Sequence, residues 1–318
     1  VTPSINNDSL TSIDFPPISP QRSLSPSASS RSTLNASRFN TNALPVLDPL
    51  YEDDQEDWEI VFEDDFSSVD ISTEKWSHEI SCDDGRAGNE SQYYTHAYAN
   101  TKIHEGNLLI AAREEWNNSD NFAFDAFEER IKPVSSAHLT TKHKFDFQFG
   151  RVCLKAKMPG GRGLWPQMTL LPVDPEHDTA AELKVAEFMS ISRKKYSHNL
   201  LKSEIMYGGK FPHVARAKNR VRLPPEEHPA FHFNEYCVDW RPDSIVWTVN
   251  GKKYGQATRW HQTVDDENVL EQPAPFNEPF YISLKVAVGA NWVSRHSRGA
   301  TSLPSAMEVE SVKVWQRK

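Results

Sequence analysis

The sequence predicts an all-β fold, one large β-sandwich, over residues 58–318. Roughly a dozen short apolar or alternating runs are separated by Gly, Pro, Asn and Asp, a pattern typical of all-β domains. A 3.6-residue periodicity is almost absent, which argues against helices. Sixteen Phe, nine Trp and nine Tyr also suit strands and carbohydrate sites.

The first predicted strand begins at Trp58, where the polar N-terminal composition ends. The segment 261–278 is expected to be loop, and 114–129 loop or partly helical. The runs that we expect to form strands are 58–66, 101–113, 137–142, 149–158, 165–172, 181–190, 202–207, 231–240, 244–249, 281–288 and 307–315.

Composition excludes several classes of function. The 318 residues carry a formal charge of −9, which gives no reason to expect nucleic acid or an anionic membrane as partner. No apolar run reaches the roughly 18 residues of a transmembrane helix. Cys82, Cys153 and Cys237 have no metal-ligand spacing and allow at most one disulfide, so no cofactor is expected.

Residues 1–57 differ in composition from the rest of the chain. The first 50 hold eleven Ser and seven Pro, and an acidic run follows at 51–57. Such a segment buries too little apolar surface to offset its ordering entropy. We expect an extended or disordered arm and spacer, with wrapping around a protein partner as the alternative. The chain starts at Val1 without methionine, from which we expect a processed product.

One stretch, AELKVAEFM at 181–189, carries the residues most suggestive of chemistry. In a strand, Glu182 and Lys184 share one face, and Glu187 is out of phase by one residue. A β-bulge at Val185 and Ala186 would return Glu187 to that face. Retaining glycosidases use two carboxyl groups roughly 5 to 5.5 Å apart. The simpler alternative is an exposed, ion-paired strand face.

The order of motifs around this stretch resembles glycoside hydrolase family 16, in its laminarinase-like branch of endo-β-1,3-glucanases and β-1,3-glucan recognition proteins. The resemblance covers residues 58–317 and implies a jelly-roll sandwich of two curved antiparallel sheets with a concave substrate cleft. It rests on GNESQYYT at 88–95, GRVCLKAKMP at 150–159, GLWP at 163–166, LLP at 170–172, YGG at 207–209, DW at 239–240, VNG at 249–251, PFY at 279–281 and GANW at 289–292.

The family motif E-x-D-x-x-E implies Glu182 as nucleophile and Glu187 as acid/base, with Lys184 in place of the aspartate. Further departures from the family pattern are Thr169 for a tryptophan, Met206 for a histidine and Lys285 for an asparagine. The resemblance implies a substrate-binding set of Asn89, Glu90, Tyr93, Trp165, Met206, Lys285 and Trp292.

Lys184 places an ammonium group where the family has a carboxylate. A neighbouring cation favours the ionised carboxylate, and an ionised Glu187 cannot donate the proton that catalysis requires. We therefore expect a catalytically impaired protein that binds β-1,3-glucan or a related polysaccharide, or that is structural. The alternatives are an active retaining endo-β-1,3-glucanase or glucan transferase, and a structural subunit of an assembly.

The resemblance carries two weaker implications. Glu63 and Glu310 lie where some family members hold a structural calcium ion. The family also implies an extracellular or secretory location, which the composition does not show.

Overall fold

The structure is a computed structural model, and it describes residues 57–81, 90–115, 124–125, 130–131, 134–161, 163–174, 181–188, 199–209, 214–264, 268–289 and 303–318. The predicted arm lies outside these residues, apart from Asp57. The chain divides into two units, Val1–Ala43 and Leu44–Lys318, and the described residues all belong to the second. Within them, no helix is long and apolar enough to cross a membrane.

Strands make up nearly all of the regular structure, and a 3₁₀ turn at Pro225–Glu227 is the helical element of the described residues. The strands are β1 Trp58–Asp64, β2 Ser77–His78, β3 Gln92–Tyr94, β4 Thr101–His104, β5 Asn107–Glu114, β6 Phe124–Asp125, β7 Arg130–Ile131, β8 Val134–Ser136, β9 His138–Thr140, β10 Gly150–Lys157, β11 Leu164–Pro172, β12 Glu182–Phe188, β13 Leu200–Gly208, β14 Val214–Arg222, β15 Asn234–Trp240, β16 Ile245–Val249, β17 Lys252–Ala257, β18 His261–Thr263, β19 Val269–Glu271, β20 Phe280–Val288 and β21 Ser305–Arg317.

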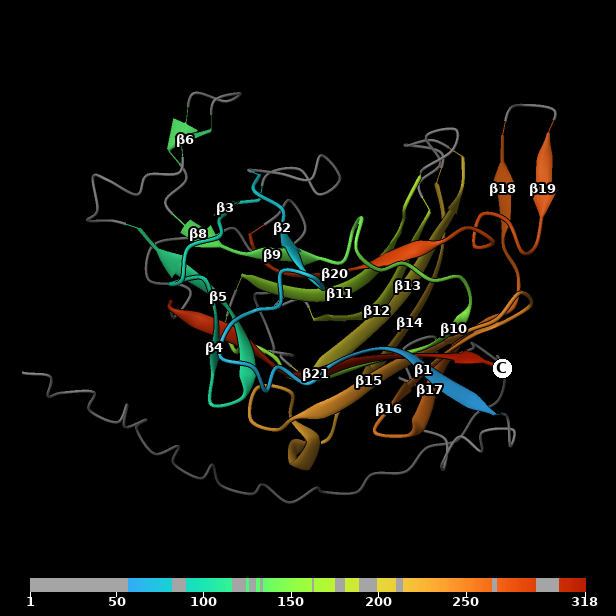
Figure 1. Cartoon of the computed structure of the whole chain (residues 1–318). Helices are drawn as coiled ribbons and strands as arrows, with labels where there is room; N and C mark the ends of the chain where they lie inside the picture. The colour runs from blue at the N-terminus through green and yellow to red at the C-terminus, as the bar shows by residue number, and fades with distance from the viewer. Residues whose placement is uncertain are drawn as a thin grey trace, which may run out of the picture. The chain divides into compact units, whose positions relative to one another are not determined.

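Two large sheets form the sandwich (Figure 1). The ten-stranded sheet has the order β17-β16-β15-β10-β21-β5-β8-β3, with β1 beside β21 and β4 beside β5. The nine-stranded sheet has the order β19-β18-β13-β12-β11-β20-β9-β2, with β14 at the edge beside β13. The pairs are antiparallel except β3 with β8 and β13 with β18. The predicted all-β sandwich is confirmed.

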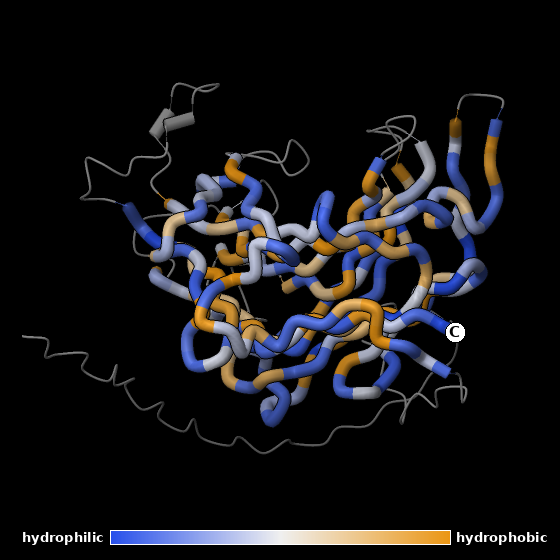
Figure 2. Tube along the Cα trace, viewed as in Figure 1, coloured by the Kyte–Doolittle hydropathy of each residue, from blue (hydrophilic) through white to orange (hydrophobic). Residues whose placement is uncertain are grey.

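The core lies between the two sheets, because each sheet turns one apolar face inward. Val152 and Leu154 of β10 and Leu183 and Val185 of β12 are fully buried in one continuous cluster. Figure 2 shows hydrophobic and hydrophilic residues alternating along the strands, as expected for sheets with one buried face. The alternation visible in the sequence therefore decides which side of each strand faces the core.

Every run expected to form a strand contains one or overlaps one. The prediction of loop for 261–278 is wrong, since β18 and β19 pair there. Strand β14 was not expected, because its charged face and small residues give little apolar signal. Strand β17 was also missed, although Asn250 and Gly251 both have positive φ and form the tight turn that Asn-Gly favours.

Strand β12 contains the expected bulge. Lys184 pairs with Glu204 and Glu187 with Lys202, so Val185 and Ala186 stand opposite Ser203 alone. The pairing with β11 shifts at the same place. A bulge leaves backbone groups without ladder partners. Here the carbonyl oxygen of Lys184 accepts a 2.9 Å hydrogen bond from Trp247 Nε1 of the opposite sheet.

Replacing Trp247 by Phe should lower the free energy of unfolding, because the Lys184 carbonyl would be left buried without a donor. We expect a loss about 1–3 kcal/mol larger than for Trp240→Phe. Trp240 is equally buried, but its Nε1 has no hydrogen-bond partner among the described residues. Urea denaturation of both variants checks this, and equal losses would contradict it.

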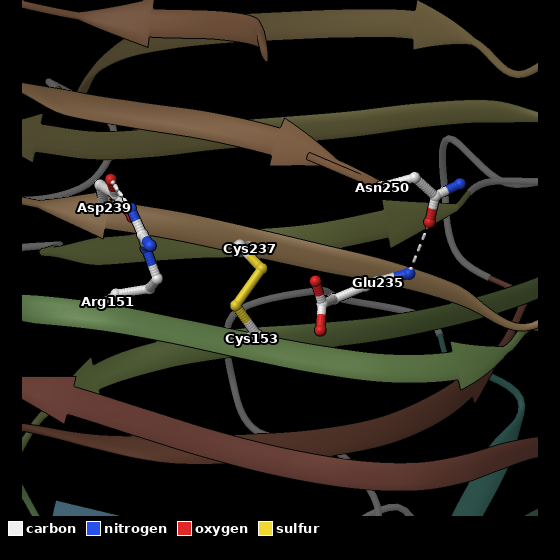
Figure 3. Close-up of a disulfide and its surroundings, with 6 residues drawn as sticks. All are labelled: Arg151, Cys153, Glu235, Cys237, Asp239 and Asn250. Atoms are coloured by element: carbon white, nitrogen blue, oxygen red, sulfur yellow. Dashed lines mark hydrogen bonds and ion pairs between the residues drawn. A yellow bond between two sulfur atoms is a disulfide. The ribbon is translucent and has the colours of Figure 1, made fainter. Parts of the chain in front are cut away.

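A disulfide joins the middle strands of the ten-stranded sheet. Cys153 of β10 and Cys237 of β15 are directly opposite, with Cα atoms 4.1 Å apart. Both face away from the core, and Figure 3 shows Glu235 next to them and the Arg151–Asp239 ion pair further along the strands. Cys82 lies outside the described residues.

The disulfide closes a long loop, since its cysteines are 84 residues apart in sequence. Removing it in a Cys153→Ala, Cys237→Ala variant should lower the free energy of unfolding by about 2–4 kcal/mol, because the unfolded chain gains freedom. Denaturation with and without dithiothreitol measures this. The reductant should shift the wild type and leave the double variant unchanged; a wild type insensitive to complete reduction would contradict the prediction.

Candidate functional site

The bulge places Glu182, Lys184 and Glu187 on the outer face of the nine-stranded sheet. Their neighbours Leu183 and Val185 point the other way and are fully buried in the core. Lys184 and Glu187 are themselves only 8% and 6% exposed. The alternative of an exposed, ion-paired strand face is therefore half right: the ions pair, but they are buried.

Cross-strand register arranges charged and polar side chains of this face in three rows. Directly opposite residues on neighbouring strands lie roughly 4.5–5.5 Å apart at Cβ, so each row is a chain of neighbours. The rows are Lys285–Gln167–Glu187–Lys202–Arg220, then Ser283–Thr169–Lys184–Glu204–Lys218, then Glu182–Met206–Arg216.

Lys184 lies between Glu182 and Glu187 along its strand, and its ammonium group is bonded to Glu187. Its Nζ donates a 2.7 Å hydrogen bond to Glu187 Oε2. It also lies over the ring of Trp165, 5.5 Å from the centroid. The Lys184 side chain thus bonds the carboxylate of Glu187, which the family motif assigns as acid/base. It also covers one face of the Trp165 ring.

The charge of Lys184 is secured by its surroundings. Burial by itself lowers the pKa of a lysine, but the carboxylates of Glu182, Glu187 and Glu204 outweigh it and hold the pKa of Lys184 above its ordinary value. Lys184 is consequently an ammonium ion at neutral pH.

A second buried polar cluster connects strand β3 to the end of β20. The Glu90 carboxylate accepts hydrogen bonds from Gln92 Nε2 and, at 3.0 Å, from Tyr94 Oη, while Gln92 Oε1 accepts the backbone N–H of Val288 at 2.7 Å. Lys285 Nζ lies 4.0 Å from Glu90 Oε1 and over the Tyr94 ring. The charge of Lys285 is thus balanced by Glu90, a pairing that the sequence did not predict.

A cavity of about 710 Å³ opens on this face over strands β11 to β14. Its volume is in the range of small-molecule sites. Its charged and aromatic lining consists of Trp165, Lys184, Glu187, Lys202, Glu204, Arg216, Lys218 and Arg220.

The structure thus brings together six of the residues singled out from sequence: Glu182, Lys184, Glu187, Thr169, Trp165 and Met206. Glu90 and Lys285 form the second cluster, and Tyr93, on β3, is partly exposed. Asn89 and Trp292 lie outside the described residues.

The sequence analysis missed four cations of this face, Lys202, Arg216, Lys218 and Arg220. For the three on β14, the alternation of basic residues in ARAKNRVR at 215–222 was the available signal.

The calcium candidates do not form a cluster. Glu63 pairs with Lys313 at 2.8 Å and Glu310 with Lys155 at 2.6 Å, so each carboxylate already has a cation. Among the described residues, the single group of three possible metal ligands is Cys153, Glu235 and Cys237. Its two sulfur atoms are committed to the disulfide.

Comparison with known proteins decides the family. The profile of the glycosyl hydrolases family 16 matches residues 88–302, which is about two thirds of the chain and includes every strand from β3 to β20. The chain belongs to glycoside hydrolase family 16.

Relatives in family 16 include both enzymes and binding proteins. The chain is 30% identical over 81% of its length to glucan endo-1,3-beta-glucosidase A1 of Niallia circulans. It is 29% identical over 59% of its length to beta-1,3-glucan-binding protein 1 of Galleria mellonella. The matched region spans 38% of the length of each of these relatives.

The fold agrees with solved family 16 structures. The catalytic domain of the laminarinase from Thermotoga petrophila superposes with a TM-score of 0.67 at 23% identity, covering 83% of this chain and 99% of that domain. The predicted jelly roll is thereby confirmed, and the laminarinase-like resemblance with it.

The ion pair predicts a specific energetic coupling. Lys184→Met should lower the free energy of unfolding by about 3 kcal/mol, because it leaves Glu187 buried without its bonded cation. The double variant Lys184→Met, Glu187→Gln should lose less than the sum of the two single losses, by about 1–3 kcal/mol. Urea denaturation of the four proteins in this cycle measures the difference.

Lys218→Met is the matched control on the same face. Lys218 is 63% exposed and lies 3.6 Å from Glu204, so its loss should change stability by about 0.5 kcal/mol or less. Additive losses at 184 and 187 would contradict a direct pair.

Proposed function

We propose that this chain binds β-1,3-glucan on the outer face of the nine-stranded sheet and is impaired in hydrolysis. The observation that carries the proposal is the 2.7 Å bond from Lys184 Nζ to Glu187 Oε2 in a buried setting.

The chemistry of retaining hydrolysis explains why this contact matters. One carboxyl group must hold a proton near neutral pH and give it to the leaving oxygen, a step worth roughly 10²- to 10⁴-fold in rate. Glu187, the residue that the family motif assigns to this step, accepts a hydrogen bond from a permanent cation. Because Lys184 Nζ is bonded to Glu187 Oε2, this oxygen must give up a buried contact before it can carry a proton to the leaving group.

Sugar binding has no such requirement. It depends on a groove, hydrogen-bonding groups and aromatic surface, and the cavity with its polar lining provides these features without proton transfer. The similarity to a β-1,3-glucan-binding protein supports binding, and the similarity to a glucan endo-1,3-beta-glucosidase supports the same linkage.

The test measures binding and turnover on the same purified chain. Laminarin should bind in isothermal titration calorimetry, while the release of reducing ends should fall at least about 100-fold below that of an ordinary endo-β-1,3-glucanase, as expected for loss of a general acid. In Met206→Trp, the larger side chain would take up space in the third row of the face, so this variant should bind laminarin more weakly. Turnover comparable to that of the ordinary enzyme would overturn the proposal.

A second candidate, an active retaining endo-β-1,3-glucanase or glucan transferase, is favoured by one observation. The bulge brings Glu182 and Glu187 onto one face, as double displacement requires. Glu182→Gln separates the candidates: an active enzyme would lose its turnover, whereas the impaired protein has little to lose. Failure to bind any β-glucan would instead favour a structural subunit.

A further inference from the structure

Three side chains that can bind a metal ion meet on the outer face of the ten-stranded sheet. The Sγ atoms of Cys153 and Cys237 and a carboxylate oxygen of Glu235 all lie within 4.8 Å of one another. Glu235 comes two residues before Cys237 on β15, so strand alternation places both on one face (Figure 3). Zinc accepts cysteine sulfur and carboxylate oxygen as ligands of the same ion.

Reduction of the disulfide makes both sulfur atoms available to a metal ion. A tertiary phosphine supplies the two electrons that break the S–S bond, while water supplies two protons to the thiols and its oxygen to the phosphine oxide. A dithiol reaches the same state by thiol–disulfide exchange and is itself oxidised to a disulfide. Each thiol then loses its proton to solvent as its sulfur binds the ion.

The sheet keeps the ligands in place without the disulfide. Strand β10 pairs with β15 over residues 150–156, and each is also paired on its other side, β10 with β21 and β15 with β16. In tetrahedral zinc sites, with bonds of about 2.3 Å to sulfur and about 2.1 Å to oxygen, ligand atoms lie about 3.6–3.8 Å apart. Rotation of the two cysteine side chains about their Cα–Cβ bonds opens the sulfur atoms to this spacing.

A cavity of about 320 Å³ lies over the disulfide, and Cys153, Glu235 and Cys237 are all part of its lining. It gives an ion access to the three side chains from the outer face of the sheet. A zinc ion with three protein ligands takes a water molecule as the fourth, and the cavity has room for one.

Two lysines stand opposite the ligands on neighbouring strands, and each has a carboxylate partner outside the site. Lys313 of β21 lies 2.8 Å from Glu63, and Lys155 of β10 lies 2.6 Å from Glu310. Within the described part of the chain, neither ion pair involves Glu235. Coordination of a metal ion by the Glu235 carboxylate therefore breaks neither of them.

We propose that the reduced form of the chain binds zinc through Cys153, Cys237 and Glu235. The ion then replaces the disulfide as the link between β10 and β15, so these strands are joined in both redox states. The site lies on the ten-stranded sheet, whereas the proposed glucan site lies on the nine-stranded sheet. The inference does not depend on glucan binding.

The test uses the full chain with Cys82→Ala, so that Cys153 and Cys237 are the remaining cysteines. The protein is reduced with tris(2-carboxyethyl)phosphine in urea, refolded by dilution and titrated with cobalt(II), whose bonds to thiolates give a charge-transfer absorption. One cobalt ion should bind per reduced chain, and zinc should displace it, as the order of divalent-metal affinities requires. The oxidised chain should show no charge-transfer absorption.

Two glutamate variants separate coordination from general electrostatics. Glu235→Gln should weaken zinc binding at least about 10-fold, because losing even a group that only orients a ligand costs about that much. Glu308→Gln is the matched control, since Glu308 lies opposite Lys157 on the same face, pairs with it at 2.7 Å and is not one of the three ligands. Competition with a chromophoric chelator measures both affinities, and the control should keep that of the parent.

Stability gives an independent readout. Zinc should raise the urea midpoint of the reduced chain, because an ion that binds the folded state stabilises it. A reduced chain that zinc neither refolds nor stabilises would overturn the inference. Equal zinc affinities of the two glutamate variants, or the same cobalt spectrum in the oxidised chain, would overturn it as well.

Discussion

The β-bulge of β12 is the constraint on which the functional face depends. If the strand alternated regularly from Lys184 without the bulge, Ala186 would face the groove and Glu187 would point into the core. The bulge is held from the other side of the sandwich, where the Trp247 indole satisfies the Lys184 carbonyl. Core packing and groove chemistry therefore meet at one residue, whose backbone is bonded inward and whose side chain is bonded outward.

The outer face of the sheet is an electrostatic surface built by strand register. Opposite charges face each other at Glu187 and Lys202 and at Lys184 and Glu204, an arrangement that stabilises neighbouring strands. The pattern fails at the next strand, where Lys202 meets Arg220. The same register thus explains why the β12 side of the groove is neutralised and why the β14 side is basic.

The two sheets have different roles. The ten-stranded sheet carries the disulfide on its outer face, between strands that are central in the sheet order, and its other face supplies Trp247 and Trp240 to the core. The nine-stranded sheet carries the cavity and the polar rows, which are exposed where they reach β14. The ten-stranded sheet thus carries the covalent cross-link, and the nine-stranded sheet carries the candidate functional site.

The all-β class, the limits of most central strands, the family and the bulge could be predicted before the structure was known. Each of these follows from local alternation or from motifs whose residues are near one another in the chain. The folded sheets were needed to show that Lys184 bonds Glu187, that Lys285 lies beside Glu90, and that Cys153 pairs with Cys237. It also revealed β14, whose basic row becomes a groove wall only when paired with β13. Ion pairs and disulfides join residues that register brings together, and register is a property of the folded sheet.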